Sequence, residues 1–383
     1  MQTSGKSDAE FDAIVIGVGG MGSAACYALA RRGLRILGLD RFPLVHNQGS
    51  SHGESRIIRK AYFEHPDYVP LLHRAYDLWH DLERVSGQKL LRQTGLVLSG
   101  TADGETIRGT RLSAEQHHLE LQNLSANEAR RRFPGFAFPN HHDVAFEPIA
   151  GTLFVEDCVR AHIDGAVQRG AIIRGSEPVT DWSSDGKSVC VRTATGEYRA
   201  RSLVITSGAW AAECLRDLQL PLTVVRKFVG WFPHHNDAFL ADRGCPAYFF
   251  ELPHGTFYGI PGFDSTTIKV AEHSGGEIVT DLDRIDRSCH PGDLVRLQSF
   301  LTDHLPGVDL EPARYSVCLY TLTPDRHFAI DLHPKWNNVA FAAGFSGHGF
   351  KFCPVVGEAL ADLVQKGTAA LPIGFPGCRR EGG

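Results

Sequence analysis

The segment Gly17–Gly22, with the sequence Gly-Val-Gly-Gly-Met-Gly, constrains the fold of this chain more than any other feature. It follows an apolar stretch over 11–16 and precedes a helix-forming stretch over 23–32. A second apolar stretch over 34–39 comes next and ends at Asp40. This order predicts a strand, a tight glycine turn, a helix and a second strand, which together form a βαβ unit.

Three glycines of this segment have separate tasks in a dinucleotide-binding turn. Gly17 permits the tight turn, Gly19 lets the backbone approach a pyrophosphate, and Gly22 lets the helix pack closely against the strand. Asp40 lies 18 residues after Gly22, where its carboxylate can accept hydrogen bonds from ribose hydroxyls. We therefore predict a dinucleotide site, with a purely structural βαβ turn as the alternative. The residues predicted to form it are Gly17, Gly19, Gly20, Met21, Gly22 and Asp40.

The composition is that of a soluble globular protein with enough residues for two domains. Of its 383 residues, 43% are hydrophobic and 22% are charged. The formal net charge of −5 gives no electrostatic reason to expect nucleic acid or an anionic membrane as a partner. The 19 histidines are scattered and form no metal-binding pattern, so we expect no metal site.

Cysteine usage and the ends of the sequence predict a cytoplasmic protein. The nine cysteines form no CxxC pair and suggest no disulfide framework, as in a reducing compartment. The polar stretch 1–10 lacks the basic and apolar regions of a secretory signal, and no run of 18 apolar residues suggests a membrane span. The last residues, 380–383, carry no peroxisomal-type tripeptide.

The rest of the chain alternates between two kinds of pattern. Helical spacing of apolar residues predicts a helix over 68–85, and a βα rhythm returns over 152–173. Near the C-terminus, an apolar strand enters a glycine-rich turn and then a helix over 354–365. Short strand-like pieces and polar turns fill 86–150, and aromatic strands over 216–317 suggest an antiparallel sheet with one face against a pocket.

These patterns predict an α/β chain, α+β overall, in which one domain interrupts another. The first is a Rossmann-like nucleotide-binding domain, and the second is a substrate-binding domain built on a mainly antiparallel sheet. We assign 1–85, 152–215 and 318–383 to the nucleotide-binding domain, and 86–151 and 216–317 to the substrate-binding domain.

Three segments beyond the glycine turn make a specific resemblance visible. They are 49–59 (GSSHGESRIIR), 317–321 (VCLYT) and 344–351 (GFSGHGFK). Together they resemble the monomeric sarcosine oxidase and N-methyltryptophan oxidase family of flavoenzymes, over about residues 11–365. The resemblance implies an FAD-binding domain, with FAD attached covalently through Cys318. It also implies oxidation of a secondary amino acid by hydride transfer to FAD, reduction of O₂ to hydrogen peroxide and hydrolysis of the imine.

The resemblance also implies roles for individual side chains. It assigns Arg59 and Lys351 to the substrate carboxylate, for which a planar guanidinium and a compact ammonium are suited. It places Arg56 and Lys269 as cations beside the flavin ring, where a fixed charge stabilises a developing anion. It further implies catalytic roles for His52, Tyr258 and His273, a substrate contact for Tyr320, and cofactor contacts for Gly344, Gly347, His348, Gly349 and Lys351.

Each of these residues also has an ordinary structural interpretation. Arg59 could be a surface salt-bridge residue, Lys269 the solvent face of a strand, and Cys318 a buried, inert thiol. Tyrosines and histidines commonly lie half-buried with a satisfied polar tip. The sequence assigns no general base.

The substrate and the class of activity stay open in part. Phe249, which we include among the substrate-binding residues, stands where sarcosine-oxidising relatives carry methionine, and the loop 264–266 also differs from theirs. N-methyl amino acids and cyclic imino acids such as pipecolate or proline therefore all remain candidates. A NAD-dependent dehydrogenase and a non-catalytic flavin-binding protein are further alternatives. We expect a monomer whose partners are a small amino acid and O₂.

Overall fold

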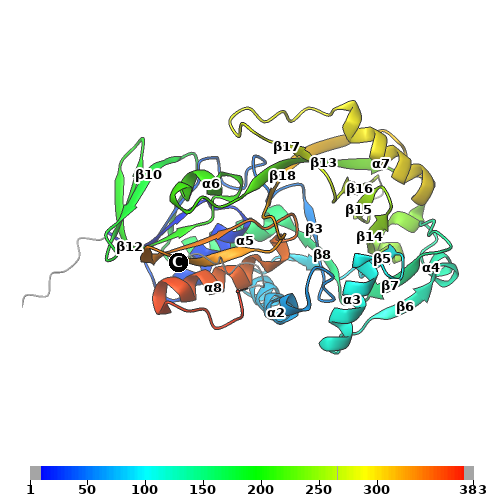
Figure 1. Ribbon diagram of the computed structural model, residues 1–383, viewed down its shortest axis with the longest axis horizontal. Coiled ribbons are helices and arrows are strands. Elements are labelled where there is room, and N and C mark those ends of the chain that lie inside the picture. Colours follow the sequence, from blue (N-terminus) through cyan, green and yellow to red (C-terminus); the bar gives the residue numbers. More distant parts are fainter. Residues whose placement is uncertain (1–9, 265, 375–383) are drawn as a thin grey trace, which may run out of the picture.

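The computed structural model describes residues 10–264 and 266–374 and contains three β-sheets (Figure 1). The predictions for the stretch 1–9, for Ser265 and for the end of the chain at 375–383 lie outside the described residues. The first sheet and its helices form one part of the molecule, and the second sheet lies beside it (Figure 1).

The first sheet contains the predicted βαβ unit. β1 (Phe11–Ile16) pairs in parallel with β2 (Ile36–Leu39) on one side and with β12 (Glu197–Ile205) on the other. β20 (Trp336–Ala343) adds in parallel to β12, which confirms the predicted C-terminal strand. The outer strands of this sheet are β9 (Ile172–Arg174), β10 (Val179–Ser184), β11 (Val189–Thr193) and β19 (Ala329–His333).

Three helices pack against the first sheet, and a fourth packs on two of these helices. α1 (Gly20–Arg31) contacts both α5 (Val155–Val167) and α8 (Cys353–Lys366). α2 (Val69–Ser86) packs on α8 and buries Leu72 and Trp79 in the same core. The predicted helices over 68–85 and 354–365 are confirmed.

The second sheet is mainly antiparallel, as predicted. Its strands follow the order β17-β13-β16-β15-β14-β5-β7-β6, and β18 pairs with β13. The pairing of β14 with β5 is parallel, and the other pairings are antiparallel. Their bounds are β5 Leu96–Gly100, β6 Gln122–Ser125, β7 Asp143–Glu147, β13 Thr223–Pro233, β14 Ala247–Leu252, β15 Gly255–Ile260, β16 Thr267–Glu272, β17 Glu277–Ile278 and β18 Arg314–Leu322.

A small third sheet contains the end of the segment 49–59, which resembles the flavoenzyme family. β3 (Ser55–Ile58) pairs with β8 (Gly151–Phe154), which also pairs with β4 (Leu91–Arg92). The predicted boundary at residue 318 falls inside β18, which pairs with β13 along its whole length. Cys318 therefore lies on a strand of the second sheet.

Helices within the stretch 86–150 were not expected from the sequence. The prediction of only strands and turns over 86–150 is wrong, because α3 (Glu105–Gln116) and α4 (Ala126–Arg132) lie there. α4 begins with a capping box, and a glycine inside α3 allows a close backbone approach. The remaining helical elements are α6 Ala211–Cys214, α7 Pro291–His304, and the 3₁₀ turns η1 Pro66–Tyr68, η2 Gly208–Trp210, η3 Arg216–Leu218, η4 Asp237–Phe239, η5 Ala241–Arg243 and η6 Phe350–Phe352.

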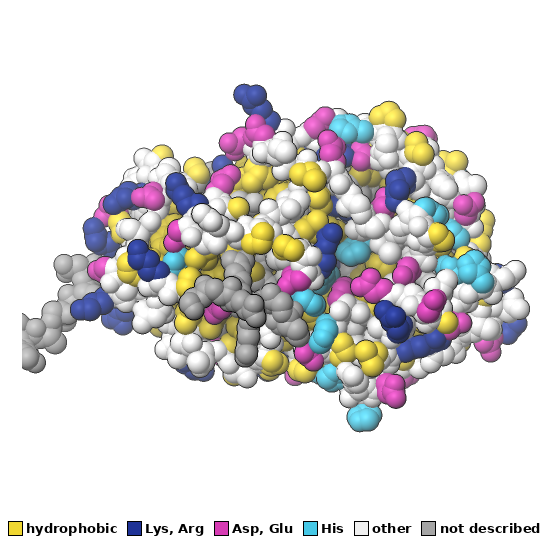
Figure 2. All heavy atoms as spheres, in the orientation of Figure 1, with side chains coloured by type: hydrophobic (Ala, Val, Ile, Leu, Met, Phe, Trp, Pro, Cys, Tyr) yellow, Lys and Arg dark blue, Asp and Glu magenta, His cyan; other side chains and the backbone are white. Residues whose placement is uncertain are grey.

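Charged and histidine side chains gather along the middle of the face drawn in Figure 2, between the parts that hold the first and second sheets. Within the ranges that the structure describes, no group of three or more His, Cys, Asp or Glu side chains could hold a metal ion. Over the same ranges, we find no helix with the length and apolar character needed to cross a membrane.

Candidate active site

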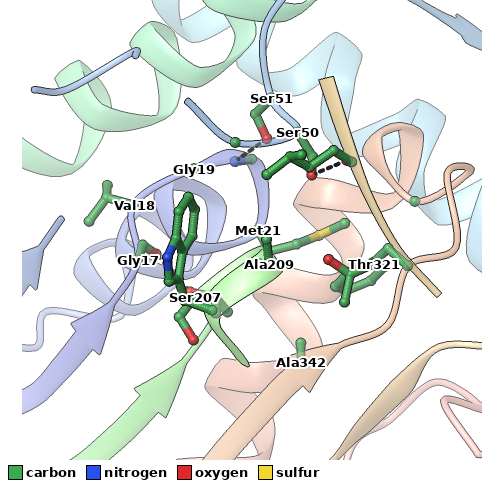
Figure 3. A pocket seen from close by; sticks show the side chains of 18 of the residues that line it. Gly17, Val18, Gly19, Met21, Ser50, Ser51, Ser207, Ala209, Thr321 and Ala342 are labelled. Atoms are coloured by element: carbon green, nitrogen blue, oxygen red, sulfur yellow. Dashed lines mark hydrogen bonds between the residues drawn. The ribbon is translucent and has the colours of Figure 1, made fainter. Parts of the chain in front are cut away.

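A cavity of ≈ 1500 Å³ opens at the C-terminal ends of the parallel strands β1, β2, β12 and β20 (Figure 3). This edge is where ligands bind in open α/β sheets. The glycine turn, the residues after β12 and the Gly344–Gly347 turn all line it. Of the predicted cofactor residues, it is lined by Gly17, Gly19, Gly20, Met21, Asp40, Gly344, Gly347 and Gly349.

The geometry of the glycine turn fits a phosphate cradle. Gly17 has a φ of +83°, and a Cβ there would lie 2.6 Å from the carbonyl oxygen of Thr206. A Cβ on Gly22 would lie 1.7 Å from the carbonyl oxygen of Gly17, so the helix packs against the turn only with glycine at this position. Gly22 thus shapes the cradle without lining it. Gly19 lines the cavity without a side chain, so its backbone is open to a ligand phosphate.

Hydroxyl groups that sequence reasoning missed brace this cradle. Ser51 Oγ accepts a hydrogen bond of 2.9 Å from the N–H of Gly20, and Ser50 Oγ donates one of 2.6 Å to the carbonyl oxygen of Leu319 (Figure 3). Both serines precede β3, so they join the segment around residue 50 to the helix start and to β18. A serine pair gives no distinctive signal in a single sequence.

Asp40 lies where a ribose-binding carboxylate is expected and supports the turn as well. Its side chain accepts hydrogen bonds from the N–H of Val18 at 2.7 Å and from that of Phe42 at 2.9 Å. Asp40 is 5% exposed and lines the cavity. Its contact with ribose stays a prediction.

A second cavity, of ≈ 560 Å³, meets the first. Arg56, Tyr320, Gly347 and Phe350 line both cavities, so the two spaces adjoin at these residues. The second cavity brings together all four predicted substrate-binding residues, and five of its lining residues had no role assigned from the sequence. Its lining is Arg56, Ile57, Arg59, Phe63, Glu64, Leu96, Phe249, Tyr258, His273, Tyr320, Gly347, His348, Phe350 and Lys351.

Arg59 is held in this cavity by an acidic partner that sequence reasoning missed. Its Nη2 donates to both carboxylate oxygens of Glu64, at 2.6 and 2.8 Å, and its guanidinium lies 4.0 Å from the centre of the Phe63 ring. Burial favours a raised pKa for Glu64, but the charges of Arg59, His348 and Lys351 hold that pKa down at about 2. Arg59 is thus a buried cavity residue, which decides against the surface salt-bridge alternative.

Lys351 is the second cation of the cavity and has no acidic partner in hydrogen-bond contact among the described residues. Its Nζ donates to the carbonyl oxygen of His348 at 2.6 Å and approaches the hydroxyl of Tyr62 at 3.5 Å. Tyr62 in turn shares a hydrogen bond of 2.6 Å with Nδ1 of His348. Burial, reinforced by the charge of Arg59, lowers the pKa of Lys351 to about 7. His348 and Lys351, both predicted as cofactor contacts, line the second cavity and not the first.

Aromatic rings form the wall of the second cavity nearest to Phe249. The ring centres of Phe63 and Phe249 are 5.2 Å apart, and those of Phe249 and His273 are 5.7 Å apart. Tyr320 and Tyr258 continue the wall, at 5.7 and 6.3 Å from His273. Burial, and next the charge of Lys227, lower the pKa of His273 to about 3, so its imidazole is neutral at neutral pH.

Cys318 lies in a buried cluster of basic groups. Its Sγ is 3.5 Å from Nη2 of Arg56 and 3.9 Å from Nδ1 of His52. Burial alone raises the pKa of a thiol, but His52, Arg56 and Lys269 together lower that of Cys318 to about 6. These basic groups therefore favour the thiolate form of the sulfur, in contrast to an inert buried cysteine.

Lys269 is buried on β16, and its ammonium group points to the backbone at the start of β3. Nζ donates to the carbonyl oxygens of Gly53 at 2.7 Å and Ser55 at 2.6 Å. Burial, followed by the charge of Arg56, lowers its pKa to about 7. Among the described residues, Lys269, His52 and Cys318 line neither of the two cavities above, and Lys269 lines a third cavity of ≈ 940 Å³.

The fold and the cradle define a dinucleotide-binding protein, and comparison with known proteins gives the family. Residues 12–363 match the family described as FAD dependent oxidoreductase (DAO). The chain belongs to this family, and FAD is its cofactor, which decides against a NAD-dependent dehydrogenase. The glycine cradle and the cavity beside it fit that cofactor.

Individual relatives match over nearly the whole chain. Monomeric sarcosine oxidase of Bacillus sp. (strain NS-129) is 41% identical over 376 residues, covering 97% of each chain. N-methyl-L-tryptophan oxidase of Yersinia pestis (strain Pestoides F) is 35% identical over 367 residues, covering 95% of this chain and 97% of that protein. The solved open form of NikD, an unusual amino acid oxidase essential for nikkomycin biosynthesis, superposes with a TM-score of 0.83, at 26% identity over 94% of this chain and 95% of that chain.

Proposed function

We propose that this enzyme oxidises a secondary amino acid, such as sarcosine or another N-methyl amino acid, with O₂ as the electron acceptor. The observation that carries the proposal is the junction of two cavities: a dinucleotide cavity, and a smaller one with two buried cations. When bound, FAD supplies the redox chemistry, accepting a hydride equivalent from the carbon next to nitrogen and passing electrons to O₂ to give hydrogen peroxide.

The substrate carboxylate binds between Arg59 and Lys351. Both cations line the second cavity, and burial in a low-dielectric site strengthens their attraction for a carboxylate. The anion competes with Glu64 for the guanidinium, because Glu64 already accepts both hydrogen bonds from Nη2. The second cation, Lys351, makes no such pair and is available to the substrate.

The aromatic end of the cavity orients the amine. The nitrogen must be neutral for its lone pair to assist oxidation, and burial beside Arg56, Arg59 and Lys351 lowers the pKa of a bound ammonium group. The neutral imidazole of His273 can accept a hydrogen bond from the substrate N–H. The cavity has no need of a general base if the amine binds in its neutral form, and the imine product hydrolyses after release.

The cofactor is attached through Cys318 in this proposal. The thiolate character of Cys318, set by His52 and Arg56, is the property that a nucleophilic sulfur needs. In its ammonium form, Lys269 supplies a positive charge for the reduction of O₂, because a preorganised cation stabilises a developing anion. The third cavity gives this lysine a surface separate from the amino acid cavity.

A peroxide-coupled screen of N-methyl and cyclic secondary amino acids tests the proposal. We expect substrate-dependent peroxide, together with loss of visible flavin absorbance when the same amino acid is added without oxygen. A yellow protein that no secondary amino acid bleaches under anaerobic conditions would instead indicate a non-catalytic flavin-binding protein.

A cyclic imino acid such as pipecolate or proline is the second candidate substrate. The observation that favours it is the tilted pair of rings, Phe63 and Phe249, on the cavity wall. Each additional methylene buried against such a wall contributes about 0.8 kcal/mol, so a saturated ring gains over a single N-methyl group. The ratio of kcat/KM for pipecolate and sarcosine decides between the two candidates.

The state of the protein in the cell stays a prediction. We propose a monomer, in line with the name of its Bacillus relative, monomeric sarcosine oxidase, and a cytoplasmic location. Neither nucleic acid nor a membrane is proposed as a partner. The domain boundaries given above stand as predictions that limited proteolysis of the FAD-loaded enzyme can test.

A further inference from the structure

Lys227 is a buried lysine on β13 that the mechanism above does not use. Its side chain is 4% exposed, and Nζ donates to the carbonyl oxygens of His273 at 3.2 Å, Ser274 at 2.5 Å and Gly275 at 3.3 Å. No carboxylate lies within ion-pair distance of this Nζ among the described residues. A buried ammonium is costly unless hydrogen-bonded, so these carbonyl contacts are what keeps Lys227 in place.

The turn that Lys227 binds carries a residue of the amino acid cavity. His273 directly follows β16 and lines that cavity, where its ring contacts Phe249 and Tyr320. The turn has Gly275 at φ +63° and Gly276 at φ +116°, and glycine restrains its own backbone less than other residues do. Outside contacts must therefore fix the turn.

Lys227 supplies such contacts along its whole length. A Cβ on Gly276 would lie 3.1 Å from Cδ of Lys227, which shows how closely the aliphatic stem packs against the turn. The ammonium group lies 5.4 Å from the centre of the Tyr320 ring, on the neighbouring strand β18. One side chain thus joins β13, the turn after β16 and a tyrosine that lines both cavities.

We propose that Lys227 is a positioning residue for the amino acid cavity: by tying the carbonyl groups of 273–275 to β13, it fixes the imidazole of His273 against the bound substrate. This inference rests on the proposed function for the identity of the ligand. Lys227 touches neither the substrate nor the cofactor cavity and acts through His273.

The charge of Lys227 reinforces this effect. Glu272 on β16 attracts the ammonium, while Arg296 on α7 and Arg326 oppose its charge. Burial is the largest of these effects and lowers the pKa of Lys227 to about 8, so the group stays mostly protonated at neutral pH. A positive charge next to His273 disfavours the imidazolium and keeps the ring a hydrogen-bond acceptor.

The variant Lys227→Met tests the proposal in the FAD-loaded enzyme. Methionine keeps an unbranched apolar stem but removes the ammonium. We expect the dissociation constant of the amino acid to rise about 10-fold in anaerobic titrations, as for loss of one charged hydrogen bond, with a smaller change in the limiting rate of flavin reduction. The imidazole of His273 should also protonate at a higher pH than in the unmodified enzyme, because a repelling charge is gone. Its ¹⁵N signal, assigned with His273→Gln, reports this titration without substrate.

Two further variants separate positioning from general stability. Lys335→Met is the matched control, since Lys335 also lies over an aromatic ring, 4.7 Å from the centre of Trp336, but is exposed and outside the cavities. Lys227→Gln keeps amide donors for the carbonyls and loses the charge, so we expect the His273 titration to move while affinity stays near that of the unmodified enzyme. This variant decides the question if Lys227→Met does not fold.

A folded Lys227→Met enzyme with unchanged affinity and an unchanged His273 titration overturns the proposal. A Lys227→Gln enzyme whose affinity for the amino acid falls about 10-fold also overturns positioning through the carbonyl contacts, and one in which the His273 titration does not move overturns the charge effect. Because the His273 titration needs no substrate, it stands apart from the proposed function. That function fails separately if the unmodified enzyme is reduced by no secondary amino acid.

Discussion

Replacing Arg59 with methionine separates what this arginine does for the fold from what it does for the substrate. Arg59 is 5% exposed, pairs with both oxygens of Glu64 and stacks on Phe63. Methionine keeps an unbranched apolar side chain and removes every donor. We expect a loss of stability and a loss of carboxylate affinity, and the structure gives the size of each.

The expected loss of stability follows from the pKa of Glu64. Its pKa falls from 4.5 to about 2 in the folded enzyme, because the cations around it outweigh burial, and this difference corresponds to about 3 kcal/mol. Since the folded-state pKa is the lower one, this stabilisation is present above pH 4.5 and is lost as the pH falls toward about 2. Arg59→Met removes most of it at neutral pH, which urea unfolding of the FAD-saturated enzyme measures.

The binding term follows from the loss of a charged hydrogen-bond donor. Such a bond contributes about 1.5–3 kcal/mol, so affinity for a carboxylate ligand should fall by about 10- to 150-fold. Titration of the flavin absorbance with methylthioacetate measures this, and an amine without a carboxylate is the control ligand. The double variant Arg59→Met/Glu64→Gln should recover stability without recovering affinity.

Two results would refute this reasoning. Unchanged methylthioacetate affinity in Arg59→Met would remove Arg59 from carboxylate binding. A double variant no more stable than Arg59→Met would show that Glu64 is not the group left unpaired.

The remaining predictions concern the cofactor. In Cys318→Ser, flavin should leave the protein on acid precipitation, whereas colour stays in the pellet of the unmodified enzyme; free flavin from the latter would contradict attachment through Cys318. The rate of covalent attachment to apoprotein should rise as the pH passes through about 6 and then level off, because the thiolate reacts; a rate that still climbs near the usual thiol pKa of 9.0 would argue against a lowered pKa. Lys269→Met should slow reoxidation by O₂ far more than anaerobic reduction, and equal slowing of both half-reactions, followed by stopped-flow absorbance, would exclude the oxygen role.

Local pattern was enough to predict the nucleotide-binding part of the fold. The turn at Gly17 and Gly22 requires glycine because backbone atoms lie where side chains would be. Both positions lie in one short segment, so the local sequence reveals the requirement. The helices around Leu72 and Leu360 were also predictable, since their apolar spacing is local. Parts of the chain whose form depends on distant partners were not.

Gly109 shows why one helix was missed. It lies inside α3, where glycine lowers helix propensity, yet a Cβ there would lie 2.3 Å from the carbonyl oxygen of Phe63. The residue serves a tertiary contact that no local pattern reveals. Glu64 and Lys227 escaped notice for the same reason: their partners, Arg59 and the turn at His273, are set by the folded chain.

The three buried lysines near the site share one kind of hydrogen-bond partner. Lys227, Lys269 and Lys351 all donate to backbone carbonyl groups, and within the described part of the chain none forms an ion pair with a carboxylate. Carbonyl groups satisfy the ammonium donors but do not cancel their charge. The positive potential is therefore left for an incoming carboxylate and for developing negative charge on the cofactor side, while burial lowers the pKa of each lysine. Ion pairs with carboxylates at these positions would hold the lysines equally well but leave the site close to neutral. The use of carbonyl partners, rather than the number of cations, therefore suits this site to anions.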